Sequence, residues 1–532
     1  MKALTTMQAA YWVGRQSDTP LGGVSAHLYA EFDGSHLDVG RFQQAVSLLF
    51  QRHAALRLRI HAEGQQSIDE FATHHCLHID DWRQRDRHDL KEMLQRKRLK
   101  KSTQLLALEQ GITSDFSLSL LPDHHHRFHL DVDMIACDAM GFRRLIEDLT
   151  VLYAGETRIP LPEWFDYLAA RDADSSRVIR RQLAQRWWRH RIPHIPPAPR
   201  PLRAPDRCQS DRIALQLSAQ ESASLSSLAA SQHLTLSALF LALFAISVGY
   251  GWNMAQFRLN VPLFHRDPLL PDSDKVVGDF SNLVLLTVEL DPQASIAHFA
   301  QRLMVQLAEL ISHADYEGVS VTRDLSRLHG DVQSTPVVFT AGFGIEGKAL
   351  FSQAARQTLG ELSWVISQGP EVMLDAQVAH VADGILVNWD VRRDAFPPEL
   401  PDRLFATYRA LLRNVAWHPE NLTLTLPQML AISTPEAQAQ QQPVVEVLCQ
   451  LLARTQSCAT PTPDGEISAL NLSENALSAL FDIIAKYLGV RLEPQICLTH
   501  PTPHALAKQI CQHTPDAARR AATLLKVLAE QA

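Results

Sequence analysis

Two spacings of hydrophobic residues follow one another along the chain, and together they predict a mixed α/β protein. Residues 35–60 have the pattern of a helix that runs into a strand. In residues 126–136 apolar side chains occupy every second position, which predicts a half-buried strand. A short loop and a helix over 142–153 follow, so two acids, Asp133 and Asp138, lie near the end of the strand.

The second part of the chain begins with a Pro-rich bridge, residues 192–205, which cannot form regular structure and is expected to cross between two lobes. Helices are predicted over 219–231 and 235–249, and strands near 255–262, 282–290, 335–342, 371–379 and 384–390. The longest apolar stretch, 238–248, is about half a membrane span and predicts a buried helix.

The C-terminal residues predict a separate helical unit. Its apolar positions have helical spacing, as in Leu477, Leu480, Phe481, Ile484 and Leu488. Residues 435–443, PEAQAQQQP, are polar and bounded by proline, which is typical of a linker.

Composition narrows the class of protein. The chain is 46% hydrophobic and 20% charged, with a formal net charge of -8, which is ordinary for a globular protein and gives no basic face for nucleic acid. Seven scattered cysteines without a CxxC pair favour free thiols. The N-terminal residues lack the apolar segment of a signal peptide, so a soluble, cytoplasmic protein is expected, with no membrane partner.

Several familiar chemistries have no motif here. Patterns for nucleotide binding (GxGxxG, P-loop) and for a serine nucleophile (GxSxG) are absent. The run His124-His125-His126 invites a metal site, but consecutive strand residues alternate faces, so no metal is predicted. The acyl-transfer motif HHxxxDG is also missing, because Asp80 lies one residue too far from His74-His75.

A run of segments nevertheless resembles one family in order. Where the histidines of HHxxxDG would lie, the chain has Asp133-Met-Ile-Ala-Cys-Asp138, a DxxxxD pattern that is weak alone. The other segments are LTTMQAAYWVGR (4–15), Arg52-His53, the bridge from 188 to 202, FRLNVPLFHRDPLLPDSDKVVGDFSNLVLLTVEL (257–290), STPVVFTAG (334–342), ISQGPEVMLDAQ (366–377) and Asn388-Trp389-Asp390. Together they resemble the motifs of heterocyclization domains of nonribosomal peptide synthetases, from residue 4 to about 425.

The resemblance implies an α/β fold with two lobes like those of chloramphenicol acetyltransferase, a pseudodimer with a central tunnel. We expect the N-terminal lobe at 1–175, the C-terminal lobe at 176–428, a linker at 429–442 and a small carrier-like helical bundle at 443–532. The implied partners are acyl- and aminoacyl-carrier proteins of other subunits, which present substrates on 4′-phosphopantetheine. The catalytic domain is expected to bind no cofactor of its own.

The implied function is an enzyme that condenses a carrier-bound acyl group with carrier-bound Cys, Ser or Thr and closes a thiazoline or oxazoline, as in siderophore synthesis. An amine first forms an amide, the side-chain thiol or hydroxyl then attacks the amide carbonyl, and the ring finally loses water. The last two steps require a proton donor and a proton acceptor beside the ring carbon. A carboxyl group whose pKa is raised by an apolar tunnel serves as both in turn.

Three residues are the candidates for this chemistry. Asp375 lies between apolar residues and matches the family's LDxQ aspartate, which acts in cyclodehydration, although alone it would equally be a buried structural carboxylate. Thr340 matches the family's catalytic threonine and can donate to an oxyanion or orient the carboxyl group, although alone it fits a core strand. Gln377 matches the LDxQ glutamine and is expected to position the substrate carbonyl.

The DxxxxD acids receive a supporting role. A buried carboxylate is costly unless it is paired, and Arg266, in the LFHRDP segment, is the candidate partner of Asp138. We expect Asp138 to lock the loop between strand and helix, and for Asp133 a structural and a catalytic role stay open.

Several motif positions depart from the family pattern. They are Gly141 and Ala341 for Ser, Gly369 for Thr, Glu371 for Gln and Met373 for Trp, and they are expected to face the tunnel. An unusual substrate, a condensation that stops at the amide, or a non-catalytic scaffold that docks carriers remain alternatives. In the carrier-like unit, the position that should hold the phosphopantetheine serine is Glu474, which predicts a degenerate carrier; a one-residue shift would make Ser473 the attachment site.

Overall fold

The computed structural model describes all residues except 71–76, 157–161, 206–209, 344–348, 457–460, 464, 471, 500, 515 and 531–532. The chain forms two compact units. The first comprises Met1–Phe405 and Val415–Thr423, and the second comprises Ala406–Asn414 and Leu424–Ala532. His74, His75 and Cys76 lie outside the described residues.

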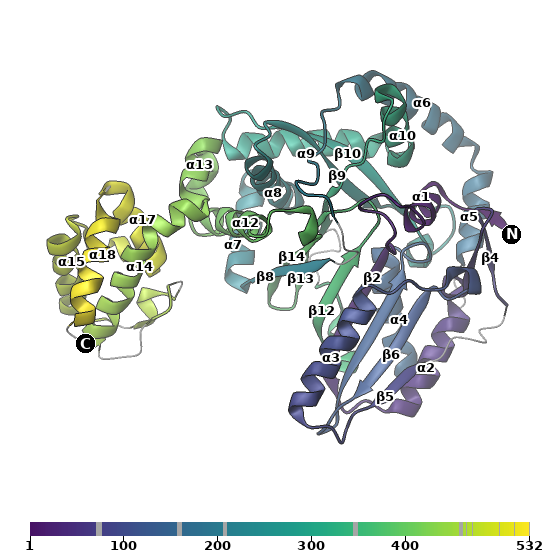
Figure 1. Ribbon diagram of the computed structural model, residues 1–532, viewed down its shortest axis with the longest axis horizontal. Coiled ribbons are helices and arrows are strands. Elements are labelled where there is room, and N and C mark those ends of the chain that lie inside the picture. Colours follow the sequence, from purple (N-terminus) through teal and green to yellow (C-terminus); the bar gives the residue numbers. More distant parts are fainter. Residues whose placement is uncertain are drawn as a thin grey trace. The chain divides into compact units, whose positions relative to one another are not determined.

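The N-terminal lobe of the first unit is built on a five-stranded sheet in the order β12-β2-β7-β6-β5 (Figure 1). Its strands are β2 (His27–Ser35), β5 (His78–Asp81), β6 (Ser114–Leu120), β7 (His125–Asp133) and β12 (Glu361–Gln368). Helices α2 (Val39–Arg52), α4 (Ala139–Tyr153) and α11 (Gln353–Leu359) pack on one face, where Phe42, Leu49 and Leu145 join Phe32 and Phe128 in one core. A small sheet in the order β1-β4-β3 lies beside it, made of Lys2–Ala3, Gln65–Ile68 and Leu58–His61.

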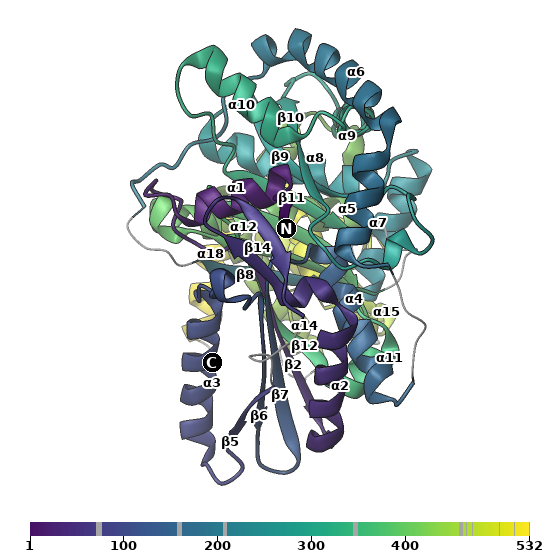
Figure 2. The same ribbon diagram turned by 90° about the vertical axis from the view of Figure 1, so that its right-hand side faces the viewer.

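The other face of this sheet is polar and is covered by α3 (Arg87–Ser102), which runs along the strands in Figure 2. Glu31 is fully buried there and pairs with Arg98 of α3 at 2.5 Å and with Arg127 at 3.0 Å. Lys101 of α3 pairs with Asp115 at 2.6 Å. Ion pairs therefore hold this helix, and its basic composition follows from the acidic face beneath it.

The C-terminal lobe of the first unit has a six-stranded sheet in the order β10-β9-β11-β13-β14-β8. The strands are β8 (Asp211–Leu217), β9 (Gln256–Phe264), β10 (Ser281–Glu289), β11 (Val337–Gly342), β13 (Leu374–Val381) and β14 (Gly384–Val391). The remaining helices of the unit are α1 (Thr6–Arg15), α5 (Trp164–Ala173), α6 (Ser175–Arg191), α7 (Ala219–Ser231), α8 (Leu236–Trp252), α9 (Ile296–Ser312), α10 (Gly318–His329) and the two ends of α12 (Leu400–Trp417). The predicted strands of this region are present, each within a few residues of its expected bounds.

Helix α8 is apolar all around and forms the centre of this lobe. Phe244 packs against Phe339 of β11 and Trp389 of β14, at centroid distances of 5.4 and 5.5 Å. Within the described residues no single helix is long and apolar enough to cross a membrane; α7 and α8 reach that length and composition only as a pair, bent by 101°. Helix α8 is the buried helix that the sequence predicts, and most of its residues are inaccessible to solvent.

Strand β12 crosses between the two sheets. It lies in the chain between β11 and β13 of the six-stranded sheet, but it pairs antiparallel with β2 of the five-stranded sheet. The C-terminal lobe is therefore not the continuous segment 176–428 that we predicted from sequence order, because a strand within that segment belongs to the other lobe. This exchange brings residues 367–372, which follow or end β12, next to the six-stranded sheet.

The second unit is helical. Helices α14 (Pro435–Gln456), α15 (Glu474–Leu488), α17 (Pro503–His513) and α18 (Ala517–Glu530) share a core that includes Leu448, Leu480, Ile484 and Leu506. Helices α13 (Leu426–Ser433) and α16 (Ile496–Thr499) complete it. Helices α13 and α14 occupy the segment 429–442 that we predicted to be a linker. Ala and Gln favour helices, and Pro435 is tolerated in a first turn.

Candidate active site

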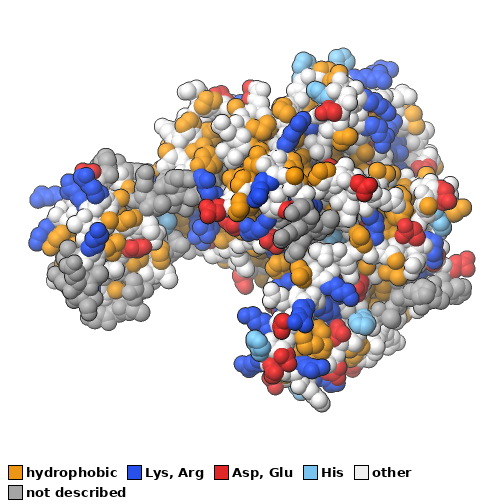
Figure 3. Space-filling model, viewed as in Figure 1, with side chains coloured by type: hydrophobic (Ala, Val, Ile, Leu, Met, Phe, Trp, Pro, Cys, Tyr) orange, Lys and Arg blue, Asp and Glu red, His pale blue; other side chains and the backbone are white. Residues whose placement is uncertain are grey.

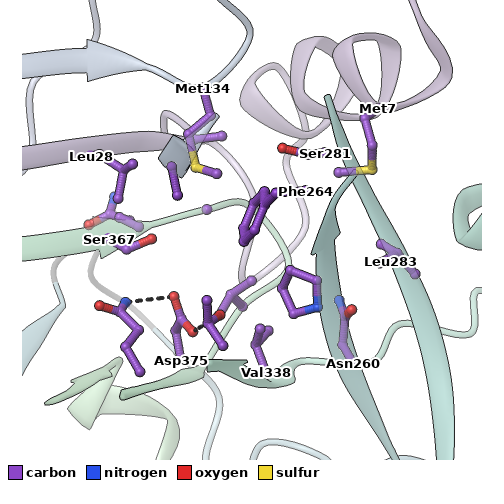
Figure 4. A pocket seen from close by; sticks show the side chains of 18 of the residues that line it. Met7, Leu28, Met134, Asn260, Phe264, Ser281, Leu283, Val338, Ser367 and Asp375 are labelled. Carbon is purple, nitrogen blue, oxygen red and sulfur yellow. Dashed lines mark hydrogen bonds between the residues drawn. The ribbon is translucent and has the colours of Figure 1, made fainter. Parts of the chain in front are cut away.

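A cavity of about 730 Å³ lies inside the first unit. Its wall is formed by strands of the six-stranded sheet, by α1, α4 and α10, and by the segment that ends β12. Most lining side chains are apolar, and Figure 4 shows Met7, Leu28, Met134, Phe264 and Leu283 around the cavity. A polar cluster on one wall interrupts this surface, with Asp375 and Ser367 close together in Figure 4.

The six-stranded sheet explains why that cluster faces the cavity. Side chains alternate between the two faces of a strand. Phe339 and Trp389 point to α8, so their neighbours Thr340 and Asp390 point the other way. In the sheet register Asp375 lies opposite Asp390, and Gln377 lies opposite both Thr340 and Asn388. The polar side chains therefore form two adjacent rows across three strands.

Asp375 accepts hydrogen bonds at both carboxylate oxygens. Thr340 Oγ1 donates to Oδ1 at 3.2 Å, and Gln377 Nε2 donates to Oδ2 at 2.8 Å. Burial raises the pKa of Asp375 from 3.8 to about 6, although hydrogen bonds from Gln377, Thr340 and Ser367 oppose the rise. This carboxyl group faces the cavity without a cation at hydrogen-bonding distance among the described residues, and it exchanges a proton close to neutral pH.

Gln377 is fully occupied by this network. Its Nε2 also donates to Asp390 Oδ2 at 2.9 Å, and its Oε1 accepts from Asn388 Nδ2 at 3.2 Å. Both amide hydrogens are therefore engaged by carboxylates, which leaves none for a substrate carbonyl in this arrangement. These hydrogen bonds orient the carboxyl group of Asp375, and the role of Gln377 toward a substrate carbonyl stays a prediction.

Asp390 is a member of the site that our sequence reasoning did not assign. It is buried, and it accepts from the backbone N–H of Ser367 at 2.8 Å, which ties the end of β12 to β14. Burial raises its pKa to about 7, with a smaller contribution from the charge of Asp375 and an opposing one from Arg212. The pair Asp383-Gly384 between two alternating runs signals a hairpin, but as a two-residue turn it would set Asp375 opposite Arg392. In the structure Val381 pairs with Gly384, so the turn is Ala382-Asp383 and Asp375 lies opposite Asp390.

The DxxxxD acids lie away from the cavity wall. Asp138 is buried, caps α4 by accepting from Gly141 N–H at 2.7 Å, and forms a bidentate ion pair with Arg266 at 2.7 and 3.1 Å. Asp133 accepts from Arg15 at 2.8 Å and from Ser25 at 2.5 Å. Burial raises the pKa of Asp133 in spite of Arg15. Neither acid is among the described residues that line the cavity.

The five departures from the family pattern fall into two groups. Ala341, Gly369 and Glu371 line the cavity, as we expected. Gly141 and Met373 do not: Met373 is fully buried, and a Cβ at position 141 would come within 2.8 Å of Cys137 Sγ. The glycine at 141 therefore accommodates a neighbouring thiol and leaves the volume of the cavity unchanged.

In the second unit, the two candidate attachment positions lie at the start of α15. Ser473 is the N-cap of this helix, and its exposed hydroxyl accepts from Ala476 N–H at 3.3 Å. Glu474 is the first helical residue and is also exposed. Throughout the described residues, no group of three or more His, Cys, Asp or Glu side chains is placed to hold a metal ion.

Comparison with known proteins identifies relatives of this chain. The chain is 39% identical over 415 residues to the phenyloxazoline synthase MbtB of Mycolicibacterium paratuberculosis, which covers 76% of this chain and 35% of that protein. It is 35% identical over 437 residues to the pyochelin synthetase PchE of Pseudomonas aeruginosa, covering 80% of this chain and 30% of that one. The chain thus spans about a third of the length of these curated relatives.

Solved structures share the fold. The EpoB cyclization-docking bidomain from Sorangium cellulosum superposes with a TM-score of 0.69 at 26% identity, over 78% of this chain and 85% of that one. The two-lobed α/β architecture of such domains is therefore the fold of this chain, as predicted. The family model described as the condensation domain matches residues 1–438, so the chain belongs to the condensation-domain family of nonribosomal peptide synthetases.

Proposed function

We propose that this chain condenses a carrier-bound acyl group with carrier-bound Cys, Ser or Thr and then closes a thiazoline or oxazoline ring. The observation that carries the proposal is Asp375, a carboxyl group in an apolar cavity with a pKa of about 6, oriented by Thr340 and Gln377. Relatives named as a phenyloxazoline synthase, a pyochelin synthetase and a cyclization domain support it.

The first step is acyl transfer. The amine of the acceptor attacks the thioester carbonyl of the donor, the amide bond forms, and the donor carrier leaves as a free thiol. The cavity contributes by holding the two reactive groups together and excluding water, which alone accelerates a bimolecular reaction strongly. Its volume of about 730 Å³ and apolar lining suit two neutral thioester arms.

Ring closure is the step for which Asp375 is suited. As a carboxylate, it removes the proton from the thiol or hydroxyl that attacks the amide carbonyl. As the resulting carboxylic acid, it gives that proton to the carbonyl oxygen, which becomes the hydroxyl group of the ring. It then takes the amide N–H proton and passes it to that hydroxyl group, which leaves as water while the C=N bond forms, so the residue ends the cycle ionised. Thr340 and Gln377 hold the two carboxylate oxygens, and Asp390 holds Gln377.

The protein is proposed to work in trans on carriers of other subunits, in the synthesis of a siderophore or a related peptide product. A second candidate function is condensation that stops at the amide, which the small residues Ala341 and Gly369 in the cavity wall favour, because they remove hydroxyl groups from it. Degeneration of the C-terminal carrier-like unit is part of the same proposal, since Glu474 cannot accept a phosphopantetheine arm.

Reconstitution tests the proposal. The chain is incubated with an acyl carrier and a cysteinyl carrier, and the product is released and weighed by mass spectrometry. A product short of two waters relative to the free acid and the amino acid is the expected ring. Loss of one water means condensation only, and an unchanged mixture means a scaffold; either result would refute the proposed ring closure.

A further inference from the structure

One guanidinium group in the cavity wall has no partner among the described residues. Arg143 lies in the second turn of α4 and lines the cavity together with Met140 and Phe142. Its side chain is half-buried, and its Nε is shielded from solvent without an acceptor. The next residue, Arg144, is placed differently, because it pairs with Asp148 at 2.7 Å. Helix α4 thus carries two consecutive arginines, of which only the one facing the cavity lacks a counter-ion.

The cavity itself supplies no free anion for Arg143. Its described lining contains two carboxylates, Asp375 and Glu371. Asp375 already accepts from Thr340 and Gln377, and Glu371 accepts from Thr19. A partly desolvated cation without a counter-ion is unfavourable, and the cost is recovered when a ligand brings the anion. The unpaired guanidinium therefore points to a ligand that carries negative charge.

We propose that Arg143 is the binding site for an anionic oxygen group of the substrate that enters beside α4, and this rests on the proposed function. Guanidinium groups bind phosphate and carboxylate oxygens through paired N–H donors. Such a substrate has two places for that chemistry: the phosphodiester at the base of its phosphopantetheine arm, and an acidic substituent on its acyl group. The rest of a pantetheine thioester is uncharged and suits the apolar surroundings of Met140 and Phe142.

A second unpaired arginine makes a matched control. Arg323 lies on α10 in the C-terminal lobe, lines the same cavity and is exposed, and it has no hydrogen bond or ion pair with the described residues. Figure 1 and Figure 2 both place α10 and α4 well apart. Arg186 on α6 is exposed, and it controls for net charge alone. Lys and Arg side chains gather at the upper right of Figure 3, where Figure 1 labels α6.

The test measures binding to the full chain by calorimetry, with thioether analogues that cannot turn over. The three ligands are S-benzyl-pantetheine, its 4′-phosphorylated form and S-(2-carboxybenzyl)-pantetheine. We expect wild type to bind at least one charged ligand about tenfold more tightly than the neutral one, as charged hydrogen bonds typically provide. Arg143→Gln should abolish that preference, while Arg143→Lys retains part of it and Arg186→Gln all of it. The preferred ligand identifies the source of the anion.

Three results would overturn the proposal. Equal binding of all three ligands by wild type would show that the cavity has no anion site, whatever the variants do. A preference that survives in Arg143→Gln would place the site elsewhere. An equal loss in Arg323→Gln would mean a general positive potential and not a bound anion. Because no ligand is turned over, these outcomes are independent of whether the chain forms a ring.

Discussion

Asp375→Asn separates the proposed proton transfer from a structural role, because it removes the ionisable group and keeps its shape. In the folded chain the pKa of Asp375 rises from 3.8 to about 6, a difference of about two units. Each unit corresponds to about 1.4 kcal/mol, so ionised Asp375 destabilises the fold by up to about 3 kcal/mol. The hydrogen-bonding neighbours accept the amide, since Thr340 can also accept and Gln377 can still donate to an oxygen.

The sign of the pH dependence follows from these values. Between about pH 4 and pH 6 the folded chain holds a proton on Asp375 that the unfolded chain has lost, so this residue lowers stability as the pH rises through that window. Above about pH 6 Asp375 is ionised in both the folded and the unfolded chain, so the loss of stability is complete and no longer changes with pH. We therefore expect Asp375→Asn to be more stable than wild type at pH 8, by up to about 3 kcal/mol, and to gain little near pH 4. Denaturant unfolding at the two pH values measures the difference.

The ring-forming activity of Asp375→Asn should fall, although its stability rises. Loss of a general acid–base group typically costs a factor of about 10² to 10⁴, so ring formation falls by that factor while the uncyclized amide accumulates. In wild type, ring formation should rise with pH around a midpoint of about 6, because the cycle begins from the carboxylate. A variant that closes rings at the wild-type rate would refute the chemistry. A variant that is less stable than wild type at pH 8 would make Asp375 a structural carboxylate.

Three further predictions follow from the same geometry. Asp390→Ala removes the acceptor shared by Gln377 and the backbone of Ser367, so ring formation should fall with amide formation retained, and Asp390→Asn should restore it; equal loss in both variants, by product mass, would mean that charge and not hydrogen bonding matters. Asp138→Ala leaves the buried Arg266 without its partner and should cost about 3–5 kcal/mol of unfolding free energy, and a variant with unchanged thermal stability would contradict the locking role. Incubation with a phosphopantetheinyl transferase and coenzyme A should leave the intact mass unchanged; a gain of the arm that Ser473→Ala abolishes would show a working carrier.

The family and the two-lobed fold could be predicted because short sequence motifs are enough to identify both. The motif segments keep their order and spacing, and the match over residues 1–438 and the shared fold confirm the condensation domain and its architecture. The exchange of β12 could not be predicted in the same way. Its residues alternate like any strand, but its partner β2 lies over 300 positions earlier, and no local pattern encodes such a pairing. The first turns of α14, residues 435–442, were assigned to a linker because their composition is polar.

The candidate site shows how a motif can identify residues without giving their roles. Of the candidate aspartates Asp133, Asp138 and Asp375, only Asp375 lines the cavity; the other two pair with arginines. An acid that reaches substrate and has neutral hydrogen-bond donors can exchange its proton near neutral pH, whereas an acid locked to an arginine serves better to hold a loop. The hairpin register explains how Gln377 and Asp390 come to lie at the site. It sets the carboxyl groups of Asp375 and Asp390 opposite each other, and the side-chain amide of Gln377 donates to both. The chain keeps Thr340 and the hydrogen bonds that join Asp375, Gln377 and Asp390. This is the strongest argument that the departures at Ala341 and Gly369 change which substrate fits and leave the residues proposed for proton transfer in place.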